Sequence, residues 1–319
     1  MPLIDMPLAE LKEYMGTNPR PADFDAYWDT AVAEMPAIDP KIEMIPIEEQ
    51  FASAEAFHLY FTGVGGARVH AKYLRPKGVR QPHPGVVHFH GYAGHSHEWY
   101  EYLPWVAEGF SVAAMDCRGQ GGLSQDNSSV SGTTLNGHII RGLDDKPENL
   151  FFRKLCLDSA QLAGILMAMP EVDAERVGAC GMSQGGALTL ACAALEPRIK
   201  RAAPGCPGMS DYRRLWDMDL GGVQHEEMTF YFTRYDPRHE REQEVFTKLG
   251  YIDMQHLAPR IQAKVMMFTG LMDTICPPSV QFAAFNKICS EKQVVIYPDF
   301  AHDVYPGQMD MTLEFMKGI

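Results

Sequence analysis

The sequence predicts an α/β fold built on a mostly parallel central sheet with helices on both faces. After Pro84 there are five apolar runs typical of strands covered on both faces: GVVHFH, FSVAAMD, RVGACGM, KRAAPG and KVMMFTG. Between them lie segments whose apolar residues recur at spacings of three and four. Strands that alternate with helices favour parallel pairing with right-handed crossovers.

Residues 1 to about 80 predict a helical and edge-strand extension of this sheet. The stretch from Pro21 to Met35 begins with Pro and an acidic first turn, and its large apolar residues follow helical spacing. Three stretches of period two follow, starting near Lys41, Phe57 and Ala67, with Gly and Pro between them. They predict antiparallel edge strands.

The remaining helices are predicted between and after the buried strands. Their segments carry apolar residues at helical spacing, and Pro or Gly commonly marks their ends: Arg153 to Met169, Gln184 to Leu195, Pro278 to Ile288 and Met309 to Met316. Between about 207 and 260 strand signals are missing, and aromatic and charged residues occur together, which predicts a helical insertion over the sheet. Without repeats or a flexible linker, residues 1–319 are predicted to form one domain.

The composition argues against several classes of partner. The chain has 28 Lys and Arg against 41 Asp and Glu, a net charge of −13, and such a field repels nucleic acid and anionic lipid. There is no run of eighteen apolar residues, and the first residues lack the basic and apolar regions of a signal peptide. We therefore expect a cytoplasmic protein that binds neither nucleic acid nor membrane. The seven cysteines are scattered and form no C-x-x-C pair, so they are interpreted as free buried thiols.

The strongest chemical signal is the sequence G-M-S-Q-G at residues 181–185. It follows an apolar run and precedes a predicted helix, so its order is strand, tight turn, helix. In that context G-x-S-x-G is typical of the nucleophile elbow of α/β-hydrolases, because small flanking residues let the serine adopt a strained conformation that lifts its hydroxyl above the sheet. Ser183 is therefore the predicted nucleophile.

A nucleophilic serine needs a base, and in the α/β-hydrolase fold the acid and the histidine follow the serine in the chain. Asp273 follows the run KVMMFTG and His302 follows the run VVIYP, so both fall at the carboxyl ends of predicted strands, where open α/β sheets bind ligands. Ser183, Asp273 and His302 form the predicted catalytic triad. Asp116 and Asp299 have ordinary turn interpretations, and the alternative for Asp273 is a helix-capping acid.

Acyl transfer also requires hydrogen-bond donors for the oxyanion of the tetrahedral intermediate. In this fold one donor is the backbone N–H of the residue after the nucleophile, which is Gln184. The second comes from the loop after an early strand, where His90-Gly91-Tyr92 parallels the corresponding loops of esterases, so we predict the Tyr92 N–H. The alternative is that His90 and Gly91 only make a tight turn.

A dense group of histidines near this loop also suggests a metal site: His88, His90, His95 and His97. Thiolates and carboxylates do not cluster with them, and strand alternation separates the first two from the last two, which fall in a loop. We therefore predict no metal and no organic cofactor. The His225-Glu226 pair in the insertion is interpreted as a surface feature.

With these residues in hand, the chain resembles carbohydrate esterase family 7, the acetyl xylan esterases and cephalosporin C deacetylases. The family pattern is R-G-Q, then G-x-S-Q-G, then H-E. The chain has R-G-Q at residues 118–120 and G-M-S-Q-G at residues 181–185, and the strings PADFDAYWD, FHGY, YFTRYDP and GLMDTICPPS match as well. The resemblance extends over essentially the whole chain. One departure is Asp303, which stands where the family has Glu.

The resemblance implies an intracellular α/β-hydrolase that removes acetyl groups from small esters, including acetylated xylooligosaccharides and cephalosporin C, without a cofactor. It also implies a homohexamer, a dimer of trimers, whose active sites face an internal chamber. The triad and oxyanion roles fall on the residues named above. Arg118 and Gln120 would be structural supports near the site, and the shorter Asp303 would loosen that support without touching the triad.

Two alternatives remain open. Another acyl hydrolase on the same fold, such as a thioesterase or a peptidase, would use the same triad. A binding protein that keeps the fold without catalysis is the second alternative, although such proteins usually lose a triad member and all three are present here.

Overall fold

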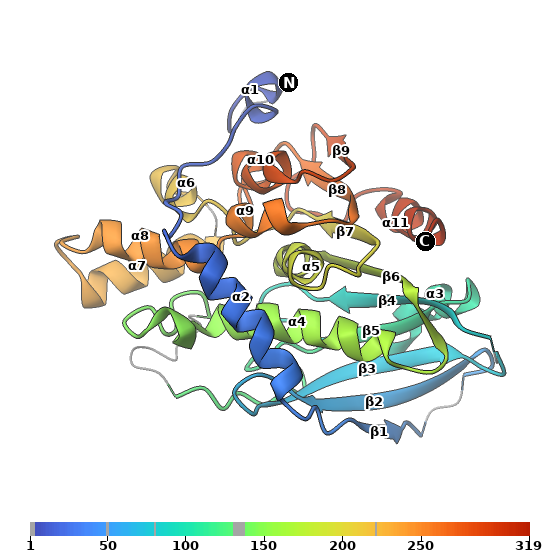
Figure 1. Ribbon diagram of the computed structural model, residues 1–319. Coiled ribbons are helices and arrows are strands. Elements are labelled where there is room, and N and C mark those ends of the chain that lie inside the picture. Colours follow the sequence, from blue (N-terminus) through green and yellow to red (C-terminus); the bar gives the residue numbers. More distant parts are fainter. Residues whose placement is uncertain (1–3, 49–50, 80, 130–137, 221) are drawn as a thin grey trace.

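A computed structural model describes residues 4–48, 51–79, 81–129, 138–220 and 222–319. Within these ranges nine strands form one sheet, in the order β1-β2-β3-β5-β4-β6-β7-β8-β9 (Figure 1). The strands are β1 Glu43–Pro46, β2 Ala54–Thr62, β3 Arg68–Pro76, β4 His83–Phe89, β5 Ser111–Met115, β6 Val172–Met182, β7 Arg201–Gly205, β8 Lys264–Gly270 and β9 Lys292–Tyr297. All five apolar runs after Pro84 are therefore strands, as predicted.

The sheet is antiparallel at one edge and parallel elsewhere. β1 pairs with β2, β2 with β3 and β3 with β5 in antiparallel ladders, whereas parallel ladders join β5, β4, β6, β7, β8 and β9. The predicted parallel sheet and its antiparallel edge strands are confirmed. Phe89 pairs with Gly181, so the carboxyl ends of β4 and β6 reach the same edge of the sheet.

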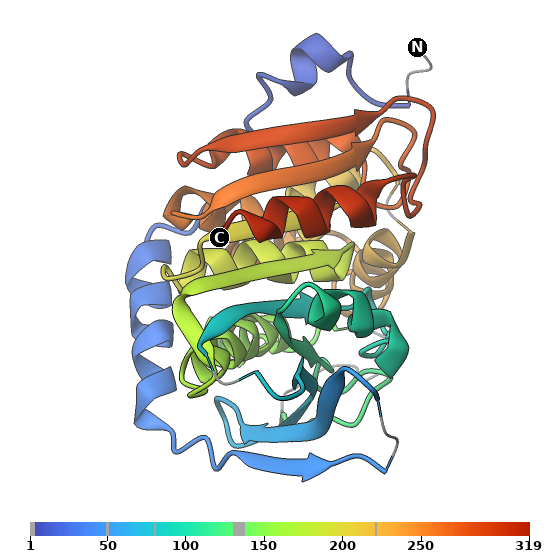
Figure 2. The same ribbon diagram turned by 90° about the vertical axis from the view of Figure 1, so that its right-hand side faces the viewer.

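Helices cover both faces of the sheet, as its apolar strands require. They are α2 Phe24–Glu34, α3 Leu103–Ala107, α4 Phe151–Met167, α5 Gln184–Leu195, α10 Pro278–Lys287 and α11 Gln308–Lys317. Alternate residues of β4 face opposite cores, since Val87 packs in the core with α4 and α5 while Val86 packs in the core with α3 and α11. Figure 2 shows α11 in red and α3 in teal in front of the sheet. None of the helices in the described ranges is long and apolar enough to cross a bilayer.

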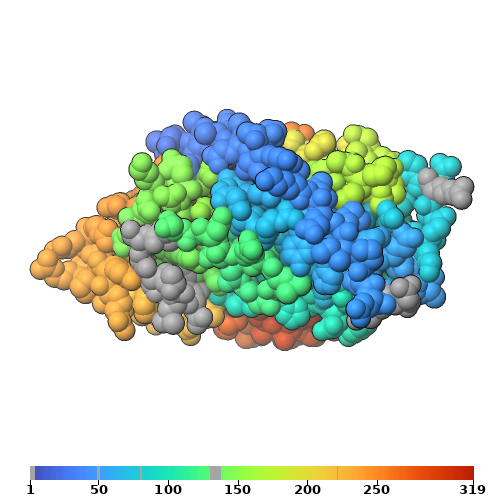
Figure 3. All heavy atoms as spheres, turned by 90° about the horizontal axis from the view of Figure 1, so that it is seen from below, coloured from blue at the N-terminus to red at the C-terminus, as the bar shows by residue number. Residues whose placement is uncertain are grey.

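The predicted insertion between β7 and β8 is helical. It contains α6 Tyr212–Asp217, α7 Gly222–Tyr235, α8 Glu242–Leu249 and α9 Met254–Leu257. α9 packs on α5, but α7 and α8 project from one end of the molecule (Figures 1 and 3). The expectation that the insertion lies over the sheet is therefore wrong for α7 and α8. Their apolar sides are buried in the core cluster that also contains residues of α4 and α5, where Phe232 and Phe246 pack together and against Trp216.

A buried acid joins the N-terminal segment to this insertion. Asp211, which precedes α6, accepts hydrogen bonds from the Thr17 N–H at 3.0 Å, the Asn18 N–H at 2.8 Å and the Tyr14 hydroxyl at 2.8 Å. Its own N–H donates to Asp253 Oδ1 at 3.0 Å. The segment before α2 thereby fixes the start of the insertion, which in turn reaches the carboxyl edge of the sheet.

Candidate active site

Ser183 lies in the tight turn that joins β6 to α5. Its backbone has φ 62° and ψ −120°, a conformation that residues other than glycine rarely adopt. A Cβ at Gly181 would lie 2.5 Å from the carbonyl oxygen of Phe89, and a Cβ at Gly185 would lie 2.1 Å from the same atom. The two glycines are therefore required because β4 passes directly beside the turn. The predicted order of strand, turn and helix is confirmed.

Asp273 and His302 follow β8 and β9 and are hydrogen-bonded to each other, with His302 Nδ1 2.7 Å from Asp273 Oδ2. The carboxylate is fully buried. Its Oδ1 accepts hydrogen bonds from the backbone N–H groups of Ile275 at 2.9 Å and Cys276 at 2.8 Å. Because Asp273 Oδ2 is a hydrogen-bond acceptor, the ring proton of His302 lies on Nδ1. The other ring nitrogen, Nε2, is then the one that can accept a proton.

One cavity brings the serine and the histidine together. It has a volume of about 810 Å³ and is lined by Ser183 and His302, and by Gly91 and Tyr92 after β4. From there it extends between α3 and α11 as far as Trp105, on the face of the sheet seen in Figure 2. Parallel strands place their carboxyl ends along one edge, which is why residues so far apart in the chain border one cavity.

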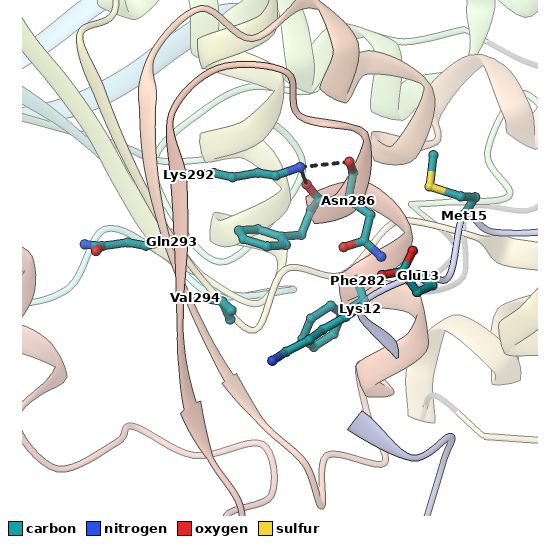
Figure 4. Close-up of a pocket in the computed structure, with 9 residues that line it drawn as sticks. Lys12, Glu13, Met15, Phe282, Asn286, Lys292, Gln293 and Val294 are labelled. Atoms are coloured by element: carbon teal, nitrogen blue, oxygen red, sulfur yellow. Dashed lines mark hydrogen bonds between the residues drawn. The ribbon is translucent and has the colours of Figure 1, made fainter. Parts of the chain in front are cut away.

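A second cavity, of about 530 Å³, lies between the N-terminal segment and α10 (Figure 4). The ammonium group of Lys292, which lines this cavity, is engaged in hydrogen bonds within the protein. Lys292 Nζ donates to the carbonyls of Phe285, Asn286 and Ile288 at distances of 2.9, 2.8 and 2.7 Å. These carbonyls end α10, so the ammonium group caps that helix. The described residues that line this cavity include no serine and no histidine. The cavity that contains Ser183 is therefore the candidate active site.

His90 fixes the start of the loop that carries Tyr92. The Cys117 N–H donates to His90 Nε2 at 3.0 Å, so Nδ1 carries the ring proton and donates to the Gly91 carbonyl at 2.7 Å. Burial lowers the pKa of His90, which keeps the ring neutral. A Cβ at Gly91 would lie 4.0 Å from Ser183 Cβ, and the next residue, Tyr92, lines the same cavity as Ser183.

Gln184 begins α5 directly after Ser183. Its side-chain amide makes two reciprocal hydrogen bonds with that of Gln120. Gln120 Nε2 donates to Gln184 Oε1 at 2.8 Å, and Gln184 Nε2 donates to Gln120 Oε1 at 3.0 Å. The loop after β5 is thereby attached to the first turn of α5. Gln120, predicted as a support near the site, contacts the residue that follows Ser183.

Arg118 supports the same loop from a deeper position. Its guanidinium donates to Asp158 on α4 at 2.7 and 2.5 Å and to the Val64 carbonyl at 3.1 Å, and both side chains of the ion pair are fully buried. Asp303, in contrast, is exposed. The predicted support at Arg118 is therefore completed by Asp158 and not by Asp303.

His95 and His97 fall in a loop, as predicted, but they are not separated from His88 and His90, because all four histidines line the cavity that contains Ser183. The ring of His88 packs against His97 and Tyr102, with centroids 5.7 and 5.5 Å apart. Burial lowers the pKa of His88 to about 3, so this ring is neutral.

The His225-Glu226 pair of the insertion is only half exposed. His225 stacks on Trp216, and Glu226 is exposed, so the surface interpretation of that pair is correct only for the glutamate.

In the part of the chain that the structure describes, one group of side chains has the spacing of metal ligands, namely Cys206, Asp273 and His302, whose ligand atoms lie within 4.8 Å of one another. Asp273 and His302 are already bonded to each other, and Cys206 Sγ lies 2.7 Å from Tyr305 Oη. Burial raises the pKa of the Cys206 thiol to about 12, which opposes the thiolate that a metal needs. Hydrogen bonds account for this group.

A second cysteine, Cys276, lies close enough to Ser183 for the serine side chain to affect the pKa of its thiol. Burial is the larger effect and raises that pKa well above its ordinary value, so the thiol stays protonated. All seven cysteines are free and six are buried, but Cys289 is exposed, so the prediction of buried thiols is wrong at that position.

Sequence reasoning missed one buried polar residue that contacts the loop after β4, namely Glu227. It is only 6% exposed although it lies on α7, outside the sheet. The Tyr92 hydroxyl donates to Glu227 Oε1, and Oε2 accepts from the Ile139 N–H at 2.9 Å. A signal was present in the sequence, because the buried side of α7 follows helical spacing and contains this acid at an apolar position: Gln224, Glu227, Met228, Tyr231 and Phe232.

Comparisons with known proteins agree with this geometry. The profile of the acetyl xylan esterase family matches residues 1–319. An acetyl esterase of Xylanibacter ruminicola is 27% identical over 291 residues, which cover 88% of this chain, and the chain spans 63% of that protein's length. Acetyl xylan esterase 1 from a Thermoanaerobacterium species is 56% identical, with a TM-score of 0.96 over 98% of both chains. An acetyl xylan esterase from a Paenibacillus species is 32% identical, with a TM-score of 0.94 over 98% of this chain and 99% of the other.

Proposed function

Because the chain belongs to the acetyl xylan esterase family, we propose that it is a serine esterase that removes acetyl groups from small esters, such as acetylated xylooligosaccharides and cephalosporin C. The observation that carries the proposal is the cavity lined both by a serine at a strained elbow and by a histidine that is bonded to a buried aspartate. The serine, the histidine and the aspartate are the three groups that the serine–histidine–aspartate mechanism of acyl transfer uses.

In the proposed acylation step Ser183 Oγ attacks the acetyl carbonyl while His302 Nε2 accepts the hydroxyl proton. Asp273 keeps the other ring proton on Nδ1 and stabilises the imidazolium. The negative charge that develops on the carbonyl oxygen is stabilised by the backbone N–H groups of Gln184 and Tyr92. The alcohol leaves with the proton from His302, and the acetyl group remains on Ser183.

In the deacylation step a water molecule attacks the acetyl-enzyme while His302 Nε2 accepts one of its protons. The second tetrahedral intermediate collapses to acetate, and Ser183 recovers its proton from His302. The elbow contributes by keeping the ester carbonyl next to the start of α5, where backbone N–H groups lack partners inside the helix. Every step uses groups of this chain, the ester and water.

The proposal is tested by labelling the purified protein with an organophosphonate and measuring the added mass on the intact protein. Wild type is expected to be labelled once, and Ser183→Ala not at all, while wild type also releases acetate from acetylated xylooligosaccharides. An unlabelled wild type would support a binding protein without catalysis. Labelling without acetate release would support another acyl hydrolase.

Preference for short acyl groups is the expected result that separates an acetyl esterase from a thioesterase or a peptidase. An acyl site shaped for an acetyl group gains little, and clashes, as methylenes are added to the acyl chain. We expect kcat/KM for p-nitrophenyl acetate to exceed that for the butyrate ester by roughly tenfold or more. Equal values for the two esters, measured side by side, would favour the rival hydrolases.

The family resemblance also supports proposals about assembly and location, namely a cytoplasmic homohexamer. Light scattering of the purified protein is expected to give six times the mass of the 35.7 kDa chain. A monomer mass over a range of concentrations would contradict the proposed assembly without affecting the proposed chemistry.

A further inference from the structure

The side chain of Tyr92 connects the loop after β4 to helix α7 of the insertion. Its hydroxyl donates to Glu227 Oε1 and accepts from the His138 N–H at 3.1 Å. The ring also packs edge-on against His138, with centroids 5.1 Å apart. Tyr92 is thus held through its side chain by residues that are distant in the chain, in addition to any constraint from its own loop.

Tyr92 lies inside a tight turn between two glycines. Gly91 precedes Tyr92, and Ala93, with φ 57°, and Gly94 follow it. Glycine itself has wide backbone freedom. Hydrogen bonds hold the two ends of the turn, since the Gly94 N–H donates to the Gly91 carbonyl at 3.1 Å and the Gly121 N–H donates to the Gly94 carbonyl at 2.9 Å. A tether on the Tyr92 ring adds a constraint on the residue between those two ends.

Glu227 is a buried acid whose hydrogen bonds suit the task of holding the Tyr92 ring. A carboxyl group at this depth is costly, and burial raises its pKa to about 8 although the backbone N–H groups of residues 138–140 lower it. Both of its oxygens are used: one accepts from Tyr92, and the other from Ile139 at 2.9 Å and Ile140 at 3.3 Å. Glu227 therefore attaches both the loop after β4 and the segment at residues 139 and 140 to helix α7.

We propose that Glu227 is a positioning residue that holds the Tyr92 ring, and thereby aims the Tyr92 N–H at the oxyanion of the reaction. This inference rests on the proposed function, because it requires that Tyr92 donate to a developing negative charge. It gives the insertion a part in catalysis, since α7 then fixes one of the two donors. Displacement of an aligned donor by about 1 Å can cost roughly 100-fold in rate.

The test compares Tyr92→Phe, Glu227→Ala, Glu227→Gln and the double variant Tyr92→Phe/Glu227→Ala. Tyr92→Phe keeps the backbone N–H and removes only the hydroxyl. For Tyr92→Phe and Glu227→Ala we expect kcat on p-nitrophenyl acetate to fall roughly 10- to 100-fold, with KM changed by less than about twofold. Glu227→Gln keeps one acceptor and is expected to lose less. Because both single variants break one tether, the double variant is expected to lose no more than the worse single variant.

A methyl trifluoromethyl ketone, which forms a tetrahedral adduct with serine, supplies the second measurement. Its affinity is expected to fall by the same factor as kcat, because both depend on the oxyanion donors. General loosening of the fold would not make these two quantities fall in step. The matched controls are Glu226→Gln, an exposed acid on the same helix, and Tyr100→Phe, which is 66% exposed; both are expected to behave as wild type.

Normal kcat and normal ketone affinity in folded Tyr92→Phe would overturn the positioning role, and so would additive losses in the double variant. If Glu227→Ala does not fold, Tyr92→Phe decides, because it leaves the bonds of Glu227 to residues 139 and 140 intact. Failure of the proposed function gives a different pattern, in which wild type itself neither hydrolyses the ester nor binds the ketone.

Discussion

Ser183→Ala is expected to lower kcat for p-nitrophenyl acetate by roughly 10³-fold or more, with little change in KM. The reason is that the hydroxyl forms the covalent bond, while the cavity that receives the ester keeps its shape. Alanine has the same Cβ as serine, so the backbone at φ 62° is under the same strain in the variant and the fold is retained. Steady-state kinetics and circular dichroism of the same sample check both parts.

His302→Ala is expected to show a loss of similar size, and the double variant with Ser183→Ala no further loss, because the two residues act as one unit. Ser53→Ala, at an exposed position away from the cavity, is the matched control and should keep wild-type kinetics. A normal rate in either Ser183→Ala or His302→Ala would refute the assignment of the triad.

The parts of the site that were predictable are those that depend on local sequence. The elbow is a local feature, since the glycines at 181 and 185 are demanded by a strand that passes beside the turn. Asp273 and His302 could be found because the ends of parallel strands share one edge, so a polar residue after each strand is a candidate before any contact is known. The bond between Asp273 and His302 shows that the two side chains meet, while their catalytic roles stay a prediction.

The parts that were not predictable depend on pairings between distant segments. Glu227 and Tyr92 are 135 positions apart, and no periodicity shows that α7 reaches the loop after β4. The position of β5 between β3 and β4 in the sheet likewise depends on pairing between distant segments. The predicted helix from Pro21 to Met35 was nearly correct: α2 begins at Phe24, after a turn in which the Phe24 N–H donates to the Pro21 carbonyl at 3.3 Å.

The largest expected effect on stability is at Arg118. Arg118→Met leaves Asp158 as a fully buried carboxylate without its partner, and we expect the free energy of unfolding to fall by roughly 3–5 kcal/mol. Arg118→Lys is not a substitute, because one ammonium cannot reproduce the two parallel bonds to Asp158 together with the bond to Val64. Urea denaturation followed by tryptophan fluorescence, at one protein concentration, measures both losses.

Two further variants separate the cost of an unpaired charge from the value of the pair. Arg118→Met/Asp158→Leu replaces both charges with apolar side chains and is expected to recover much of the lost stability, since the pair also has to overcome its own desolvation. Lys200→Met breaks an exposed pair with Glu175 and is expected to cost less than about 1 kcal/mol. Because Arg118 bonds to α4 and to Val64, whereas Gln120 contacts Gln184, the folded fraction of Arg118→Met should keep kcat within a few-fold of wild type. A stable Arg118→Met protein that has lost its activity would instead place the guanidinium in the reaction itself.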